Sequence, residues 1–524
     1  MRAPINRLPS DVFRQIMLYL KDYHMPLSTV QLAGDKWRHP SLGSWHRASG
    51  VCRRWRQETL NMQSLWTTIS VSDVDTLSMT SAWLTRSGTL PLTIVFKTHS
   101  YDDLRFSAHR PRADLAKIMS QKSRVRALGF YYRIFWLHLK FILRHFEQLE
   151  TLMVMASNVE PGSMSCSLHQ LRTLSMVCGT LWESGLYVYE LRHLSLASQN
   201  WKARDVRAFL NILAQNPHLE EVMLDNVEVD RDHWTQAVEL MQRCPCIPMQ
   251  ELKRLFIQER FCGDGLSPMA VVALHRTLPL EIPPACSRFY ISTAADTTNL
   301  GALESVAYPV KRLAVTSSSL IGTDGVSVCI IRQRHSRYHD NREGYLGYID
   351  RSQVQELWLQ MPATYRVSVF EQIHIGLLTI KAMSNVVKLT VQRKVTFWLS
   401  ALESSFPALQ ELHILMQSHS DGQAIIRFLK QRKQRGSQVD KLRFVEDSTS
   451  KFSVAFKGWK RNSWKFRCRA NQVVFEDAHM APGPTRDGNV ALLSEGLRLP
   501  EVCQGYSLSG MTWRPWYSYT TTDT

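Results

Sequence analysis

The side chains with potential for acid–base or metal chemistry gather in one polar, Arg-rich stretch. They are His335, His339, Asp340 and Asp350. Imidazole and carboxylate groups at such short spacing can transfer protons or bind a divalent metal when a fold holds them together. Nothing in the surrounding sequence fixes their mutual geometry. A solvated loop is therefore the favoured interpretation.

Motifs of the common catalytic sites are missing from the sequence. There is no GxxxxGK[ST], GxGxxG, HExxH or GxSxG. The ten cysteines are scattered, without a CxxC pair or the Cys/His spacing of a zinc site. Gly263-Asp264-Gly265 is typical of a turn and not of a phosphate loop. We therefore expect no catalytic residue, no metal and no cofactor, and a protein that is not an enzyme.

Composition indicates a large folded chain with a basic surface. The 524 residues are 44% hydrophobic and 21% charged, which excludes wholesale disorder. At roughly 150 residues per domain, this length allows about three domains. The formal net charge of +17 serves solubility or attracts an acidic partner: a protein, a nucleic acid or a membrane surface.

Targeting signals are also missing from the sequence. There is no apolar run of a signal peptide, no N-glycosylation sequon and no apolar stretch of about 18 residues. We therefore expect no membrane partner. Together with free thiols, these features predict a reducing compartment, the cytoplasm or the nucleus.

The first seventy residues predict two short helices. Ser10 or Asp11 can cap a helix that ends near Tyr23. One apolar stripe along it comprises Val12, Phe13, Ile16, Met17 and Leu20. A second helical pattern begins near Trp45, and Ala48, Val51, Cys52 and Trp55 share one of its faces. This is too little apolar surface for an independent domain, so either the rest of the chain or a partner must cover the stripe.

These residues carry a resemblance to a known family. Leu8-Pro9-x-x-Val12-Phe13-x-x-Ile16-x-x-Tyr19-Leu20, then Val51-Cys52-Arg53-Arg54-Trp55-Arg56, then Leu65-Trp66-x-x-Ile69 resembles an F-box across residues 5–69. The resemblance implies a helical module that docks on the Skp-type adaptor of cullin-based (SCF) ubiquitin ligases. The docking or supporting surface that it implies comprises Leu8, Pro9, Ile16, Leu20, Val51, Cys52, Trp55, Leu65 and Trp66.

Two further features bear on this resemblance. The segment 24–44 makes the module longer than is usual for an F-box, but the entropy of closing a surface loop grows only logarithmically with its length, so we still expect docking. The run Trp83-Leu84-x-Arg86-Ser87-Gly88-x-Leu90-Pro91-Leu92 resembles a segment that follows the F-box in proteins of mushroom-forming fungi.

An irregular repeat fills the body of the chain. The pattern apolar-x-x-apolar-x-apolar occurs twelve times, at intervals of 20 to 44 residues. Its copies begin at Val125, Leu149, Leu171, Leu191, Leu219, Leu252, Cys286, Val310, Val354, Val386, Leu409 and Val439. Helical stripes fill several intervals, and a strand plus a helix at this period resembles a leucine-rich repeat. An ordinary α/β domain whose strands begin alike is the alternative.

The predicted fold class is therefore α/β, with a short N-terminal helical F-box module followed by an irregular leucine-rich-repeat-like solenoid. Parallel strands lie on one side of the solenoid and helices on the other, with poor register around 316–353. The expected divisions are the F-box module at 5–69, a linker and N-terminal cap at 70–124, the solenoid at 125–447, a β-hairpin end cap at 448–476, and a loosely structured tail at 477–524 whose last five residues are disordered.

Within each copy, alternation predicts which side chains face outward. The first, fourth and sixth positions point into the core, and the third and fifth point out from the sheet. Outward positions rich in Arg and aromatic side chains predict a target-binding surface, unless another segment of the chain covers it. Its residues are Arg254, Phe256, Arg288, Tyr290, Arg312, Trp358 and Lys388. A basic face would suit an acidic or phosphorylated target protein.

Charge concentrates near the C-terminus, where residues 424–476 hold fourteen Lys or Arg against four Asp or Glu. In the hairpin expected at 448–476, Trp464, Phe466 and Cys468 alternate with Lys465, Arg467 and Arg469. Its aromatic rings would then lie on the buried face, where they cannot stack on bases. The alternation therefore favours an end cap over a nucleic-acid patch.

Three functions remain open on these observations. The first is the substrate receptor of an SCF-type ubiquitin ligase, which binds the Skp adaptor and cullin complex through the F-box and a target protein through the repeats. The second is a protein-binding scaffold without ligase association. The third is a basic nucleic-acid-binding protein, which the hairpin geometry disfavours.

Overall fold

The computed structural model describes the elements of the chain and the segments that adjoin them. The described residues are 8–24, 31–33, 36–38, 50–72, 77–97, 116–130, 143–155, 166–177, 186–229, 231–258, 278–294, 310–315, 319–323, 327–333, 351–360, 383–392, 395–402, 404–416, 419–446, 458–467, 469–476, 510–513 and 517–520. They are mixed α/β, with most strands parallel. Within these ranges, each helix is too short or too polar to cross a lipid bilayer.

The chain forms two compact units. Unit 1 comprises Met1–Lys253, Pro279–Pro283 and Gly505–Thr524, and unit 2 comprises Arg254–Leu278 and Pro284–Gln504. Each unit contains its own run of hydrogen-bonded parallel strands.

Unit 1 begins with the helices α1 (Ser10–His24) and α3 (Arg53–Asn61) and the 3-10 turn η2 (Gln63–Trp66). The first helix is confirmed. The second was predicted to begin near Trp45, but it begins at Arg53, because Cys52 is extended and its Sγ accepts the Trp55 amide as an N-cap. Val51 and Cys52 therefore precede the helix. Between the two helices, β1 (Gln31–Ala33) and β2 (Lys36–Arg38) pair antiparallel.

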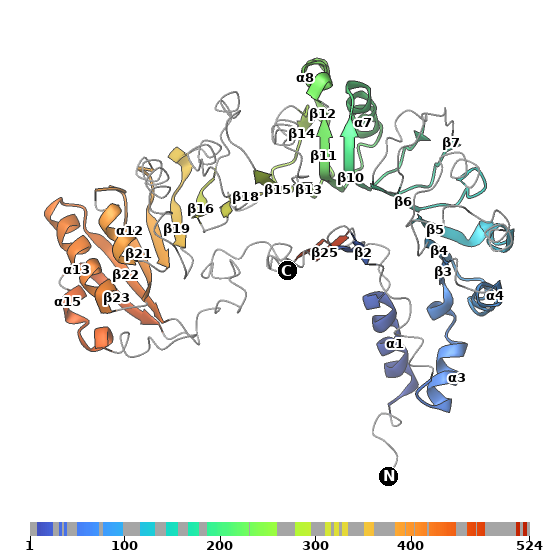
Figure 1. Ribbon diagram of the computed structural model, residues 1–524, viewed down its shortest axis with the longest axis horizontal. Coiled ribbons are helices and arrows are strands. Elements are labelled where there is room, and N and C mark those ends of the chain that lie inside the picture. The colour runs from blue at the N-terminus through green and yellow to red at the C-terminus, as the bar shows by residue number, and fades with distance from the viewer. Residues whose placement is uncertain are drawn as a thin grey trace, which may run out of the picture. The chain divides into compact units, whose positions relative to one another are not determined.

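The sheet of unit 1 has seven parallel strands in chain order. They are β3 (Thr68–Ser72), β4 (Leu92–Lys97), β5 (Val125–Phe130), β6 (Thr151–Met155), β8 (Thr173–Val177), β10 (His193–Trp201) and β11 (Glu221–Val229). Helices α7 (Ala203–Gln215) and α8 (Trp234–Arg243) lie on one side of β10 and β11 (Figure 1).

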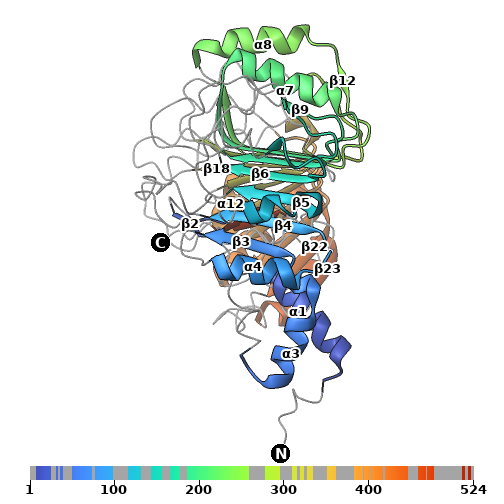
Figure 2. The same ribbon diagram turned by 90° about the vertical axis from the view of Figure 1, so that its right-hand side faces the viewer.

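The segment 70–124, predicted as a linker and N-terminal cap, contains α4 (Leu77–Arg86) and β4, and β4 pairs with β3 and β5 in the sheet. The F-box-like motif itself ends inside β3. Figure 2 shows β3, β4 and β5 side by side, with α1 and α3 next to each other near the start of this sheet. Short elements complete unit 1: η4 (Lys122–Arg124), η6 (Arg231–His233), the pair β7 (Cys166–Ser167) and β9 (Leu186–Tyr187), and the pair β12 (Ile247–Pro248) and β14 (Leu280–Glu281).

The sheet of unit 2 is parallel except at one strand. Its order is β13 (Arg254–Gln258), β15 (Ser287–Ala294), β18 (Ser327–Gln333), β17 (Ser319–Thr323), β16 (Arg312–Val315), β19 (Glu356–Gln360), β20 (Lys388–Gln392), β21 (Glu411–Met416), β22 (Val439–Glu446) and β23 (Ala470–Glu476). Strand β17 runs antiparallel to both neighbours, and this confirms the irregularity predicted around 316–353.

Helices α12 (Val395–Ala401) and α13 (His419–Gln434) lie on one face of the last strands of unit 2 (Figure 1). The 3-10 turn η8 (Arg351–Gln353) precedes β19, and α15 (Trp464–Arg467) precedes β23. The helical stripes predicted in the intervals correspond to α7, α8, α12 and α13 and are confirmed.

The twelve copies of the sequence pattern all coincide with strands. Every described side chain at a first, fourth or sixth position is buried, as the alternation predicts. Successive copies are also joined by backbone bonds just ahead of the strands. The Glu150 amide donates to the Arg126 carbonyl at 2.8 Å, and Asp440 donates to Gln410 at the same distance. Consecutive copies therefore stack in register within each unit.

The hairpin predicted at 448–476 is wrong. Residues 458–461 and α15 are helical, and β23 pairs parallel with β22. The Phe466 ring packs 4.8 Å from the Phe444 ring, so covering the end of the core outweighs the local alternation of the sequence. The tail, predicted to be loosely structured, contains an antiparallel pair in unit 1, β24 (Gly510–Trp513) and β25 (Tyr517–Thr520), and β25 lies beside β1. Disorder was predicted for residues 520–524: Thr520 is the last residue of β25, and residues 521–524 lie outside the described residues.

Candidate partner-binding surfaces

The two N-terminal helices pack through one side of α1. The Phe13 and Trp55 rings lie 4.8 Å apart, and Phe13 and Met17 are buried. At the edge of this contact, the Ser10 hydroxyl donates to Glu58 Oε1 at 2.8 Å. The packing and the hydrogen bond together fix which side of α1 faces α3.

The flank of α1 beside this packed side is left apolar and exposed. Val12 and Ile16, one turn apart, are 37% and 39% exposed, and Val51 ahead of α3 is 58% exposed. We call these three residues the N-terminal apolar patch. Five large hydrophobic side chains are exposed among the residues that the structure describes, and this patch holds three of them. Three exposed apolar side chains on one short helical module are typical of a protein-binding surface, because leaving them in water is costly.

The residues of the docking or supporting surface that the F-box resemblance implies differ in their exposure. Pro9 and Ile16 are exposed, while Leu8, Cys52 and Trp55 are half-buried. Leu65 and Trp66 are buried within the chain, so a prediction that these two contact an adaptor directly is wrong. Of the docking and supporting roles that the resemblance implies, burial leaves them the supporting one. The Leu20 side chain lies outside the described part of the structure.

Trp66 shows how this support is built. Its Nε1 donates to the Thr59 carbonyl at 2.9 Å, and its ring meets the Trp83 ring edge-on at 5.7 Å. The Arg86 guanidinium lies 4.5 Å from the ring centre. Trp66 therefore joins α3 to α4 instead of facing a partner.

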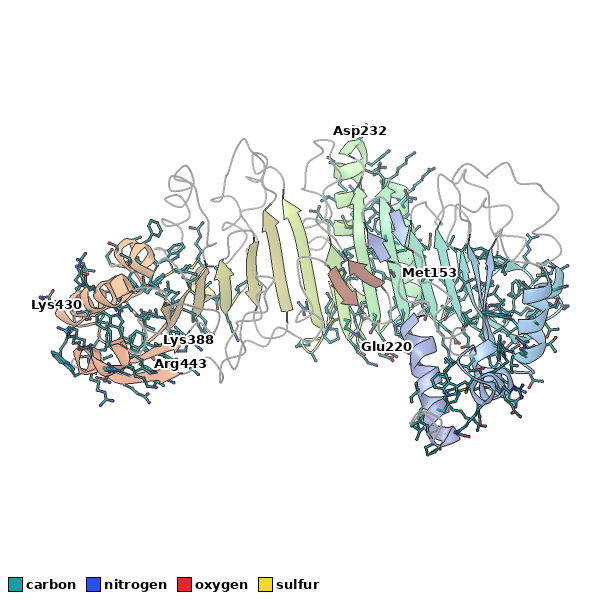
Figure 3. The ribbon with its side chains drawn as sticks, turned by 60° about the horizontal axis from the view of Figure 1, so that its bottom comes forward. Met153, Glu220, Asp232, Lys388, Lys430 and Arg443 are labelled. Atoms are coloured by element: carbon teal, nitrogen blue, oxygen red, sulfur yellow. The ribbon has the colours of Figure 1, made fainter. Side chains whose placement is uncertain are left out.

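A second candidate surface is the outward face of the strands β20, β21 and β22 in unit 2. Register places Glu356, Lys388, Glu411 and Lys441 in one row, with alternating charge. Lys388 Nζ lies 3.9 Å from Glu356 Oε1, and both side chains are half-buried. Figure 3 shows Lys388 and Arg443 on these strands. Lys388, predicted for target binding, therefore lies in a charged row.

The next row of the same face holds Thr390, His413 and Arg443. His413 is buried, and its Nε2 lies 3.1 Å from Glu411 Oε2. Burial first, and then the positive charge of Lys388, lowers the pKa of His413 to about 4. His413 is therefore neutral at pH 7. The sequence pattern did not single out His413, although His413 occupies the fifth position of the copy that begins at Leu409.

The remaining residues predicted for target binding have different outcomes. Phe256 was predicted to lie exposed on the outward face of the sheet. Its side chain is 0% exposed, so this prediction is wrong. Alternation sets the direction of a side chain and does not determine whether another segment covers it. Arg254 and Arg288 are half-buried. The side chains of Tyr290, Arg312 and Trp358 lie outside the described residues, as do His335, His339, Asp340 and Asp350.

Comparisons with known proteins identify no relative that carries these surfaces. No protein-family model matches the chain, and no curated protein matches it. The candidate surfaces therefore rest on the residues and their geometry.

Proposed function

We propose that this protein is the substrate-receptor subunit of an SCF-type ubiquitin ligase. The observation that carries the proposal is the N-terminal apolar patch: Val12 and Ile16 are exposed on a helix that packs against Trp55 through Phe13. The patch falls within the residues that resemble an F-box. A Skp-type adaptor that covered it would remove apolar surface from water, and such a receptor would work in the cytoplasm or the nucleus.

The finer fold that we propose is an irregular leucine-rich-repeat-like solenoid. Its support is the stacking of consecutive copies through equivalent backbone bonds and the helices that fill the intervals. In such a stack each repeat is stabilised by its neighbours. The charged rows on β20, β21 and β22 would then hold a target protein.

In this proposal the chain itself performs no chemistry. It holds the target close to the ubiquitin-carrying enzyme, and proximity raises the rate by replacing a bimolecular encounter with one inside a complex. No side chain of the chain is assigned as acid, base or nucleophile.

Capture of a purified Skp-type adaptor by the full chain tests the proposal. Burying one large apolar side chain contributes about 1.5–3 kcal/mol, so the pair Val12→Asp/Ile16→Asp should weaken capture by more than about 100-fold. Gln15→Asp is the matched control, because Gln15 is exposed on the same helix. Leu8→Ala/Pro9→Ala should also abolish capture. Circular dichroism confirms that each variant is folded.

Two outcomes would contradict the proposal: no capture by the wild type, or full capture by the Val12/Ile16 variant. If the wild type captures no adaptor, deletion of the inserted segment 24–44 separates the remaining possibilities. Gain of capture would mean that the insertion blocks the adaptor face. No gain would favour a scaffold without ligase association.

A further inference from the structure

The end of unit 2 carries a short helical segment, residues 458–467, that two buried rings hold in place. Trp459 packs against the first turn of α13, where a Cβ on Gly422 would lie 2.0 Å from the Trp459 ring. The Phe466 ring lies 4.8 Å from Phe444 and 5.4 Å from Trp459. These contacts fix which side of the segment faces the core.

The same contacts turn Trp464 outward. Trp464 is 60% exposed, the highest exposure among the large hydrophobic side chains that the structure describes. Lys465 Nζ lies 5.6 Å from the centre of its ring. Arg461 and Arg467 are exposed on the same segment. The indole is thus largely exposed to solvent, with the Lys465 ammonium over one of its faces.

Charge around this ring is not neutralised locally. Residues 451–475 hold seven Lys or Arg and no Asp or Glu. Among the described residues, no carboxylate forms an ion pair with Arg461, Lys465 or Arg467. The hairpin expected from the sequence would have buried the aromatic rings away from these charges, and the helical segment places one ring among them.

We propose that Trp464 and the surrounding cations bind single-stranded nucleic acid. A base of a single strand is free to stack on the indole, while the cations contact the flanking phosphates. In a duplex the bases are already stacked on each other and cannot reach the ring. The proposal is independent of the ligase function.

Two other anionic partners fit the surface less well. An acidic peptide satisfies the cations but has no flat ring to use the exposed indole. A membrane-binding helix needs a broad apolar face, whereas Phe466 and Trp459 are buried in this segment and only Trp464 is exposed.

Fluorescence anisotropy of a labelled oligouridylate with the full chain at low salt tests the proposal. Loss of the stacking of one base in Trp464→Ala should weaken the affinity for the oligonucleotide by about 5- to 150-fold. Trp464→Phe keeps an aromatic ring and should retain most of the affinity. Arg461→Glu/Arg467→Glu should reduce the slope of log K against log salt by about 1.4, at about 0.7 per phosphate contact. Arg144→Glu/Arg207→Glu is the control, because both residues are exposed in unit 1 and carry the same change of charge.

Three results would overturn the proposal. The first is no binding of the oligonucleotide at low salt. The second is equal binding by wild type and Trp464→Ala, which would mean attraction by net charge alone. The third is a Trp464-dependent interaction with polyglutamate or phosphatidylserine vesicles that is tighter than with the oligonucleotide. Adaptor capture in the same variants should be unchanged, so this test and the ligase test fail separately.

Discussion

Units 1 and 2 are built on the same strand pattern, yet their sheets carry different side chains at equivalent outward positions. In unit 1 the fifth position of successive copies holds small or uncharged residues that are buried: Gly129, Met153, Ser175, Ser195 and Met223. In β20, β21 and β22 of unit 2 the same position holds Thr390, His413 and Arg443. The pattern thus specifies a strand without specifying the chemistry of its outer face.

The units also differ in how they satisfy buried polar groups at helix ends. In unit 1 the side chain of Asn216, at the end of α7, accepts the Leu191 amide at 2.8 Å and donates to the Val188 carbonyl at 2.9 Å. In unit 2 the Arg432 guanidinium, in the last turn of α13, donates to the carbonyls of Ser405 and Phe406 at 2.9 Å. Both side chains join a helix to the turn of the preceding copy, one as a neutral amide and the other as a buried cation.

The largest expected effect is on the free energy of unfolding, when equivalent outward positions of the two sheets are changed. Met223→Ala in unit 1 should lower the free energy of unfolding by about 2–5 kcal/mol, because the side chain is fully buried. Arg443→Ala, at the equivalent position of unit 2, should change it by less than about 1 kcal/mol, since the side chain is only half-buried. Urea unfolding followed by circular dichroism measures both. Equal losses would remove the distinction between the faces.

The next largest loss of unfolding free energy is expected from the side chains at the helix ends, Arg432 and Asn216. Arg432→Ala removes the hydrogen bonds to the Ser405 and Phe406 carbonyls and should cost about 3 kcal/mol. Arg432→Lys should not restore stability, because an ammonium cannot reproduce the planar fork that reaches two carbonyls. Asn216→Ala should cost less, about 2 kcal/mol, since its bonds involve no charge. Thermal unfolding of the three variants provides the ranking, and rescue by lysine would contradict the geometric explanation.

His413 should make the stability of unit 2 depend on pH. The folded-state pKa of His413 is lowered to about 4 from its ordinary 6.5. Between these values the unfolded chain binds a proton that the folded chain does not, so stability is full above about pH 6.5 and falls as the pH drops toward 4, by about 1.4 kcal/mol per pH unit. Urea unfolding from pH 7 to pH 4.5 measures this slope. The variant His413→Gln should show a shallower slope, and an unchanged slope would assign it to other groups.

The smallest effect is a difference in cysteine reactivity between the two units, with stability unchanged. Cys286 in unit 2 is buried, and burial raises the pKa of its thiol to about 11, while Cys246 in unit 1 is exposed. The thiolate is the reactive form, so iodoacetamide at pH 8 should label Cys246 and spare Cys286 in the folded protein. Peptide mass spectrometry measures the labelling, and denatured protein is the control. Labelling of both at similar rates would mean that unit 2 opens readily.

Local sequence by itself determined most of the elements. Apolar side chains at the first, fourth and sixth positions located twelve strands, because burying one face of a strand requires this alternation. Apolar residues at helical spacing located α1, α7 and α13 in the same way. These patterns depend on near neighbours in the chain, so they can be interpreted without the fold.

Tertiary structure alone decided which surfaces remain available. Phe256 points outward and is nevertheless covered, Trp66 is enclosed by α3 and α4, and Trp464 is turned outward because Phe466 packs on Phe444. For Trp66 exposure depends on α3 and α4, and for Trp464 it depends on how the end of the core is closed. Periodicity reports the direction of a side chain, whereas solvent exposure depends on what the rest of the chain packs over it.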